Sequence, residues 1–171
     1  MRVNRTFFRY LAYALEILIF YILQGTPNFI PEIFGGRPLL LIPAALTIAA
    51  VENKIPSLVF GAVCGILTDI GSGGSVGFFA VLLTLLCYLE THIFENYIIP
   101  SVFTVAAVSA VAVPCIICLY FLLFVILPGT RELGYLFVHH YISKTVYTFV
   151  MTVPFYFLNK FFHNTLSIQS R

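Results

Sequence analysis

The sequence predicts an all-α integral membrane protein, a six-helix transmembrane bundle that forms a single domain over residues 1–171. Hydrophobic residues make up 60% of the chain, charged residues make up 9%, and the mean hydropathy is +1.00. A soluble domain of 171 residues could not bury so much apolar surface. At about 20 residues for each span, the chain holds about six spans and leaves no length for a soluble catalytic or nucleotide-binding domain.

The apolar runs place the spans in order along the chain. They cover residues 7–24, 39–51, 55–70, 76–94, 100–127 and 135–162. Basic residues precede the first run as in a secretory signal, but Glu16 interrupts its middle and no small-residue cleavage site follows, so we expect a retained span. The second and third runs reach only about 20–24 Å at helical rise, less than a hydrocarbon core of about 30 Å. We therefore expect them to form a pair of short helices.

The basic residues indicate the orientation. A net charge of +2 is too small to suggest a nucleic-acid partner, so the basic residues serve membrane topology instead. With six spans and a cytoplasmic N-terminus, the outer side carries only Arg37 and Arg131, whereas the cytoplasmic side carries Arg2, Arg5, Arg9, Lys54, Lys160 and Arg171. This excess predicts that both termini are cytoplasmic.

A line of small residues in the third run is the most informative feature. Ser57, Gly61, Gly65 and Asp69 recur every fourth residue, which stacks them on one face of a helix. Because the first three have almost no side chain, another helix can approach closely along this line. We expect the line to face another helix, either of this chain or of a partner, with Asp69 at the outer end of the contact.

Asp69 has two interpretations. It is the only aspartate of the chain, and a carboxylate in line with small residues points toward protein rather than lipid, which favours a contact with a partner or ligand. It also precedes a breaker string of glycine and serine at residues 71–75, where a carboxylate can accept hydrogen bonds from the backbone of the turn.

Two charges within the apolar runs predict an ion pair. Glu16 and Lys144 lie in the first and last spans, which run in opposite directions, and each is roughly 12–14 Å below the outer boundary at helical rise. Equal depth allows a buried pair that relieves the cost of each charge alone. A structural bridge between the two spans is the simplest role. A contact with a ligand or partner, and no contact at all, are the alternatives.

The remaining polar residues predict no catalytic centre. Glu90, His92 and Glu95 cluster at the inner end of the fourth span, and we expect them, like His139 and His140, in a solvated interface. The cysteines at positions 64, 87, 115 and 118 lie in apolar runs and are expected to be small core residues. A Ser/His/Asp order, a phosphate loop and an HExxH motif do not occur in the sequence. We expect no enzyme activity, no metal and no cofactor.

The central stretch resembles the MreD family of bacterial rod shape-determining membrane proteins. The resemblance rests on Gly-x-x-x-Gly-Ile-Leu-x-Asp at residues 61–69, a Gly/Ser turn, Gly77 and an aliphatic helix that ends at Leu89. The Arg37-Pro38 entry into the second span and the turn at Glu52 fit as well. These motifs cover residues 37–89, while the C-terminal half matches only in hydropathy. The motif positions that the family assigns are Arg37, Pro38, Gly61, Gly65, Asp69 and Gly77.

The resemblance implies a function. Members of this family are non-catalytic scaffolds of the cell-elongation complex in the bacterial cytoplasmic membrane. They bind the bitopic protein MreC and, with it, link MreB filaments to the synthases of lateral peptidoglycan. The family is likened in fold to the substrate-binding subunits of energy-coupling-factor vitamin transporters, which are six-helix bundles.

The alternative function is therefore that of a substrate-binding membrane subunit of a small-molecule transporter. Such a subunit presents a surface of small residues to its coupling partner, and the fifth span has such a line at Ala106, Ala110, Pro114 and Cys118. Ordinary helix packing explains the same line.

Overall fold

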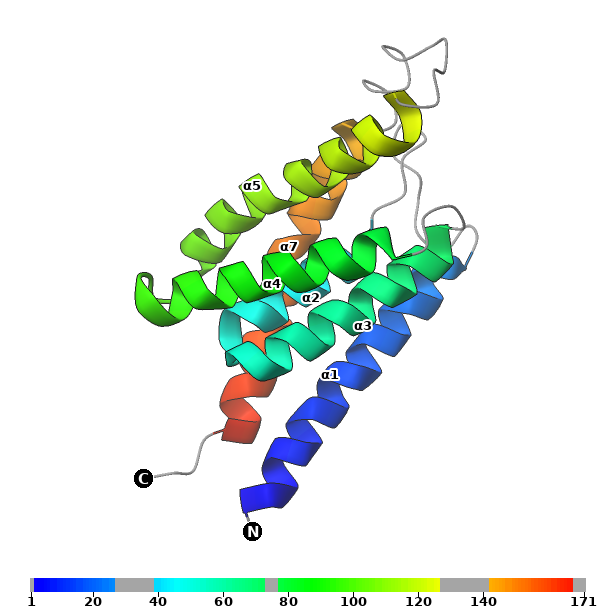
Figure 1. Ribbon diagram of the computed structural model, residues 1–171. Helices are drawn as coiled ribbons and strands as arrows, with labels where there is room; N and C mark the ends of the chain where they lie inside the picture. Colours follow the sequence, from blue (N-terminus) through cyan, green and yellow to red (C-terminus); the bar gives the residue numbers. More distant parts are fainter. Residues whose placement is uncertain (1, 27–38, 73–76, 127–141, 168–171) are drawn as a thin grey trace.

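The computed structural model describes residues 2–26, 39–72, 77–126 and 142–167, and the regular structure within these residues is entirely helical. The helices are α1 (Arg2–Gly25), α2 (Leu41–Val51), α3 (Lys54–Ser72), α4 (Phe78–Asn96), α5 (Val102–Phe121), the π-helical turn η1 (Leu122–Ile126) and α7 (Ser143–Ser167). They pack into one bundle in which α3 and α4 lie side by side (Figure 1). The all-α prediction is confirmed for the described residues.

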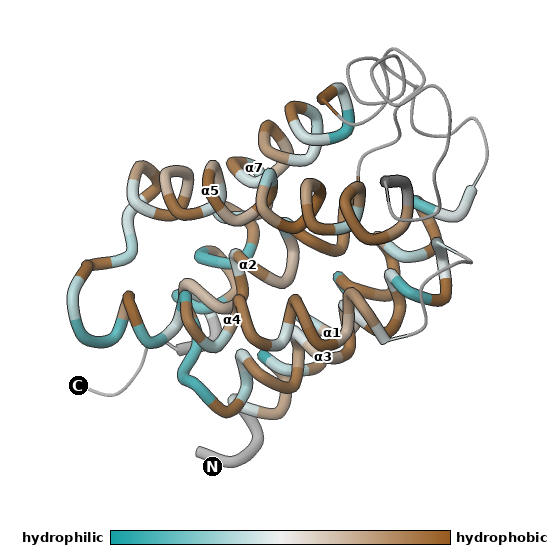
Figure 2. Tube along the Cα trace, turned by 45° about the horizontal axis from the view of Figure 1, so that its top comes forward, coloured by the Kyte–Doolittle hydropathy of each residue, from teal (hydrophilic) through white to brown (hydrophobic). Residues whose placement is uncertain are grey.

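The exposed surface of the bundle is apolar. Val81 of α4 is 71% exposed and Phe103 of α5 is 87% exposed, which would be costly in water and is normal in lipid. Figure 2 shows hydrophobic residues along the helices and hydrophilic residues mainly near the helix ends. Helices long and apolar enough to cross a membrane occupy Thr6–Gly25, Lys54–Ser72, Phe78–Asn96 and Val102–Phe124. The chain is a helical membrane protein.

Helix α2 forms the centre of the bundle. Every residue from Leu41 to Ala50 is buried, and α2 contacts α1, α3, α4, α5 and α7. Pro43 lies in its first turn, where a helix does not need the backbone N–H that proline lacks. Leu41, Ile42, Leu46 and Ile48 pack in the main core with Tyr13, Ile17, Leu83 and Ile116 from the surrounding helices.

The helix boundaries correct one expectation about the second and third spans. With 11 residues α2 is short, as expected, but α3 runs for 19 residues and is long enough to cross a membrane. The difference arises at both ends of α3, since Lys54 already begins the helix and Gly71 and Ser72 still belong to it. The two helices are therefore not a pair of short spans.

The helix ends define two ends of the bundle. The Glu52 end holds the C-terminus of α2, the N-terminus of α3 and the C-terminus of α4. Arg9 of α1 and His163 of α7 both contact Glu52 there, so the start of α1 and the end of α7 lie at the same end (Figure 1). The Asp69 end holds the C-terminus of α3 and the N-terminus of α4.

Candidate functional site

The line of small residues on α3 packs against α4 of the same chain. The Ser57 hydroxyl donates a hydrogen bond to the Cys87 carbonyl at 3.1 Å and accepts one from the Thr91 hydroxyl at 2.7 Å. A Cβ atom built on Gly61 would lie 3.0 Å from the Cys87 sulfur, and one built on Gly65 would lie 2.4 Å from the Cα of Ala80. The prediction that the line faces another helix is confirmed, and that helix is α4.

Asp69 caps the N-terminus of α4. Its Oδ2 accepts hydrogen bonds from the backbone N–H groups of Gly77 at 3.1 Å and Ala80 at 3.0 Å, and its Oδ1 accepts one from Phe79 at 3.0 Å. Gly77 has a φ of +91°, a left-handed conformation that glycine adopts without strain. Since the first N–H groups of a helix lack partners within the helix, Asp69 satisfies three of them across the turn. Of the two interpretations of Asp69, the one in which the carboxylate accepts hydrogen bonds from the backbone accounts for these bonds.

Removing this cap should destabilise the contact between α3 and α4. We expect Asp69→Ala to lower the unfolding free energy by about 1–3 kcal/mol, because buried N–H groups at the start of α4 lose a charged acceptor. Asp69→Asn should be less destabilising than Asp69→Ala, since its amide still offers one acceptor oxygen in place of the two of the carboxylate. The measurement is unfolding of the detergent-solubilised protein by titration with a denaturing detergent. Thr26→Ala, which removes an exposed hydroxyl from the end of α1, is the control. An Asp69→Ala variant as stable as the control would show that the cap contributes nothing.

Some predicted site residues lie outside the described residues. These are Arg37 and Pro38, at the entry to α2, and the histidines His139 and His140. The candidate site is therefore built from α1, α3, α4, α5 and α7 and from the central helix α2.

The predicted ion pair between Glu16 and Lys144 is wrong. Within the described residues no ion pair joins the buried Glu16 to Lys144, and the polar side chain beside Glu16 is the amide of Asn159. Along the antiparallel helices α1 and α7, the Phe20 and Phe155 rings are 4.3 Å apart. This register places Lys144 beyond the C-terminal end of α1, about 22 Å along the axis from Asn159. The equal depth that we inferred depended on a last span over residues 135–162, whereas α7 extends to Ser167.

Glu16 instead belongs to a polar group within the core. The Asn159 amide donates a hydrogen bond to the Thr47 hydroxyl at 2.8 Å, and that hydroxyl is 2.7 Å from the Pro43 carbonyl. The Asn159 carbonyl oxygen and both Glu16 oxygens are buried, and within the described helices none of them accepts a hydrogen bond of good geometry. A protonated Glu16 could donate to Asn159, which would satisfy both side chains in a region where a lone carboxylate is costly.

Glu52 is the charged centre of the bundle, and the sequence analysis did not identify it as such. Its side chain is 1% exposed, and its Oε1 lies 2.8 Å from Arg9 Nε and 3.3 Å from His163 Nδ1. The Tyr13 hydroxyl donates a hydrogen bond to the same oxygen at 3.1 Å, and Arg9 Nη2 donates to Oε2 at 3.1 Å. Glu52 therefore joins α1, the end of α2 and α7. The spacing of Arg9, Tyr13 and Glu16, which places a polar stripe on one face of α1, was the available sequence signal.

Glu90 is not in a solvated interface. It is 2% exposed, and neither of its carboxyl oxygens has a hydrogen-bond partner among the described residues. Glu95, one turn closer to the end of α4, is exposed and pairs with Lys54 at 3.0 Å. His92 is partly exposed and takes part in a contact with Asn96. The expectation for this cluster is therefore right for Glu95 and wrong for Glu90. Five residues correspond to a rotation of about 140° around the helix, so Glu90 points into the bundle whereas Glu95 points outward.

The cysteines follow the expectation of core residues only in part. Cys64 and Cys87 are buried, whereas Cys115 and Cys118 of α5 are exposed, and all four are free thiols. The small-residue line of α5 is likewise open on the outside of the bundle, since Ala110 is exposed and Pro114 only partly covered. This line does not pack against another described helix along its whole length.

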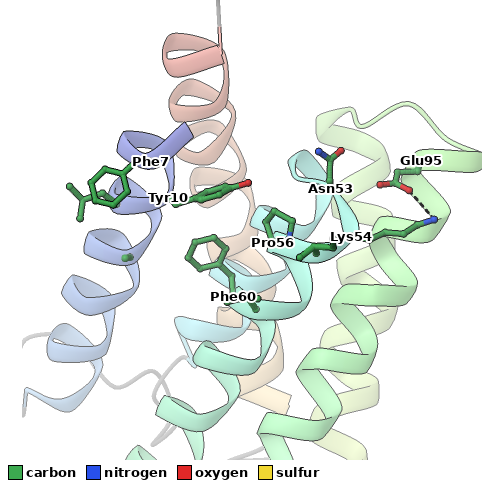
Figure 3. Close-up of a pocket in the computed structure, with 11 residues that line it drawn as sticks. Phe7, Tyr10, Asn53, Lys54, Pro56, Phe60 and Glu95 are labelled. Carbon is green, nitrogen blue, oxygen red and sulfur yellow. Dashed lines mark ion pairs between the residues drawn. The ribbon is translucent and has the colours of Figure 1, made fainter. Parts of the chain in front are cut away.

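An open groove lies between α1 and α3 at the Glu52 end (Figure 3). Its volume is about 980 Å³, at the upper end of the range of ligand pockets. In Figure 3 the rings of Tyr10 and Phe60 line its inner part, and the ion pair of Lys54 with Glu95 closes its polar end. We name it the α1–α3 groove; its residues are Phe7, Tyr10, Leu11, Ala14, Asn53, Lys54, Ile55, Pro56, Val59, Phe60 and Glu95.

The groove suits an apolar, elongated occupant better than a polar substrate. Ile55 is 77% exposed and Val59 is 55% exposed, so the groove is open along the apolar side of the bundle. Its polar groups gather at one end, as the ends of transmembrane helices require. Among the described residues, no group of three His, Cys, Asp or Glu side chains is placed to hold a metal ion.

Comparison with known proteins adds no relative. No family model, no curated protein and no solved structure matches the chain. The resemblance to the MreD family therefore depends on the motif residues, of which Gly61, Gly65, Asp69 and Gly77 converge on the contact between α3 and α4.

Proposed function

We propose that this protein is a non-catalytic scaffold of the bacterial cell-elongation machinery in the cytoplasmic membrane. In this role it binds MreC and links it, with MreB filaments, to the enzymes that synthesise lateral peptidoglycan. The observation that carries the proposal is the α1–α3 groove, an apolar trough with a polar end beside a rigid core. A trough of this kind fits the single transmembrane helix of a bitopic partner such as MreC.

The motif residues that the structure describes support the proposal because they hold α3 and α4 together. Gly65 brings the backbones of α3 and α4 together, and Asp69 fixes the start of α4. Neither lines the α1–α3 groove, so they stabilise the framework on which α3 presents Val59 and Phe60 to a partner. A scaffold needs such a rigid binding surface and no reactive group.

The orientation proposed for the bundle places the Glu52 end in the cytoplasm. Arg9, Lys54 and Lys160 lie toward that end of the described helices. Basic residues are concentrated on the cytoplasmic side of membrane proteins. In this orientation the polar end of the α1–α3 groove meets the cytoplasmic segment of a bitopic partner.

A blocked groove tests the proposal. We expect Val59→Trp to abolish co-purification of MreC from the same organism, because the indole occupies the trough, while the amount of the variant in the membrane stays normal. Val81→Trp on α4, where Val81 is 71% exposed and outside the groove, is the matched control and should retain MreC.

Photo-cross-linking gives a second readout for the same proposal. A photoreactive residue at position 59 should capture MreC, and one at position 81 should not. Equal capture from both positions, or normal co-purification with Val59→Trp, would contradict the groove as the MreC site. Co-purification of a coupling ATPase together with a bound small molecule would favour the transporter subunit instead.

A further inference from the structure

Glu90, an acid that makes no hydrogen bond with another described residue, lines a groove between α4 and α5. The groove encloses about 420 Å³ and is separate from the α1–α3 groove. Both carboxyl oxygens of Glu90 are buried, and neither accepts a hydrogen bond from the part of the chain that the structure describes. We name this groove the α4–α5 groove; its residues are Leu46, Leu86, Leu89, Glu90, Ile93, Ala107, Val108, Val111, Ala112 and Cys115.

The walls of the α4–α5 groove are two helix faces. On α4 the lining residues recur at intervals of three and four, from Leu86 to Ile93, and on α5 they run from Ala107 to Cys115. Each wall is therefore about 10–12 Å long, or two helical turns. The α5 wall is built partly from alanine and cysteine, so that another backbone can approach it closely. This shape matches a helix better than a compact small molecule.

The groove opens toward the lipid. Val111 on the α5 wall is 73% exposed and Leu89 on the α4 wall is 46% exposed. Glu90 lies six residues before the end of α4 at Asn96, which places it about 9 Å inside that end. An occupant that reaches Glu90 therefore comes from within the bilayer, and most of its surface must be apolar.

The chemistry of Glu90 specifies the occupant. A carboxyl in an apolar groove at this depth is costly unless a donor or a cation neutralises it. The other lining residues of the groove offer no basic or amide side chain. Lysine and arginine carry three and five donors respectively and no acceptor, so one such residue satisfies both oxygens.

We propose that the α4–α5 groove binds a transmembrane helix of a partner protein that carries one lysine or arginine within the membrane, paired with Glu90. The carboxyl oxygens of Glu90 are buried, although the residue lines the groove. The carboxyl therefore meets the lysine or arginine when the Glu90 side chain rotates into the groove. This proposal is independent of the α1–α3 groove and of the identity of its occupant. A helix bound here leaves the α1–α3 groove free, so the protein can hold two membrane partners at once.

Model transmembrane peptides test the proposal. The full-length protein is reconstituted in vesicles with a leucine–alanine helix that carries one lysine six residues from one end of its apolar run, the depth of Glu90 in α4, or with the same helix carrying leucine at that position. Cys118, which is also exposed but does not line the groove, is replaced by alanine. Binding is then followed by protection of Cys115 from a lipid-soluble maleimide, since Cys115 is exposed and lines the groove. Leu18→Cys, a position on α1 that is 53% exposed, provides a control thiol in the same protein.

We expect the lysine peptide to bind about tenfold more tightly than the leucine peptide, the ratio that an interhelical hydrogen bond in a membrane supports. It should protect Cys115 and leave the control thiol reactive. The preference should disappear in Glu90→Leu and weaken in Glu90→Gln. The buried Cys64 and Cys87 should stay unreactive without peptide, which shows that each variant retains its fold.

Three results would overturn the proposal. They are equal binding of the two peptides, an unchanged lysine preference in Glu90→Leu, and protection of both thiols together. Protection of Cys115 by vesicles with amine-headgroup lipids, in the absence of any peptide, would assign the groove to a lipid instead.

Discussion

Glu52→Met should be among the most destabilising single substitutions in this protein, with an expected loss of about 3–5 kcal/mol in unfolding free energy. The side chain of Arg9 is only 13% exposed, and its guanidinium would lose the carboxylate that neutralises it. The Tyr13 hydroxyl and His163 would lose their acceptor at the same time. Unfolding of the purified protein in mixed micelles measures the effect.

Two matched variants separate this effect from general damage. Lys54→Met breaks the ion pair of Lys54 with Glu95 at the same end of the bundle, where the side chains are 37% and 34% exposed. Exposed pairs contribute about 0–1 kcal/mol, so this variant should be nearly neutral. The double variant Arg9→Met, Glu52→Met should recover much of the stability, because no charge is left buried alone. If Glu52→Met were no worse than Lys54→Met, Glu52 would not be the centre that its contacts indicate.

Gly65→Ala should be the second severe substitution, with a loss of about 1–3 kcal/mol from overpacking. The added Cβ would lie 2.4 Å from the Cα of Ala80 and 2.5 Å from the carbonyl oxygen of Phe79. Both are backbone atoms of the first turn of α4, so they cannot rotate away. Displacing that turn also strains the hydrogen bonds that Asp69 accepts from it.

The glycines provide a graded series for this measurement. Gly61→Ala meets the Cys87 sulfur at 3.0 Å, a side-chain contact, and should cost less than Gly65→Ala. Gly25→Ala has no atom of the described residues within 4 Å of its added Cβ and should be neutral. Cys87→Ala should partly rescue Gly61→Ala and should not rescue Gly65→Ala. The loss of unfolding free energy should be largest for Gly65→Ala, smaller for Gly61→Ala and smallest for Gly25→Ala. Any other ranking would contradict the close contact between α3 and α4.

The sequence predicts those parts of this molecule that depend on local pattern. Apolar runs bounded by polar turns locate both ends of α3 and α4 to within two residues, and the ends of α1 and α5 to within six. The four-residue spacing from Ser57 to Asp69 predicts a helix face that packs closely, because periodicity alone decides which residues share a face.

Features that depend on register or long-range contact could not be predicted in this way. The depth of Lys144 was misjudged because an apolar run does not fix how far α7 slides along α1. Arg9 and His163 are far apart in sequence and meet only through the ends of two helices at Glu52. Glu90 resembles any acid near a helix end until the arrangement of α4 and α5 shows that it is covered.

The burial of α2 has a consequence for how the protein is made. With 11 residues, or about 16 Å, α2 is too short to enter a bilayer as an independent span. Much of what covers it comes from α7, since Leu39 and Thr47 bond to Thr148 and Asn159. Ribosomes synthesise α7 after every other described helix. During biogenesis α2 therefore lacks part of its cover until α7 has been synthesised, and the core is completed only at that stage.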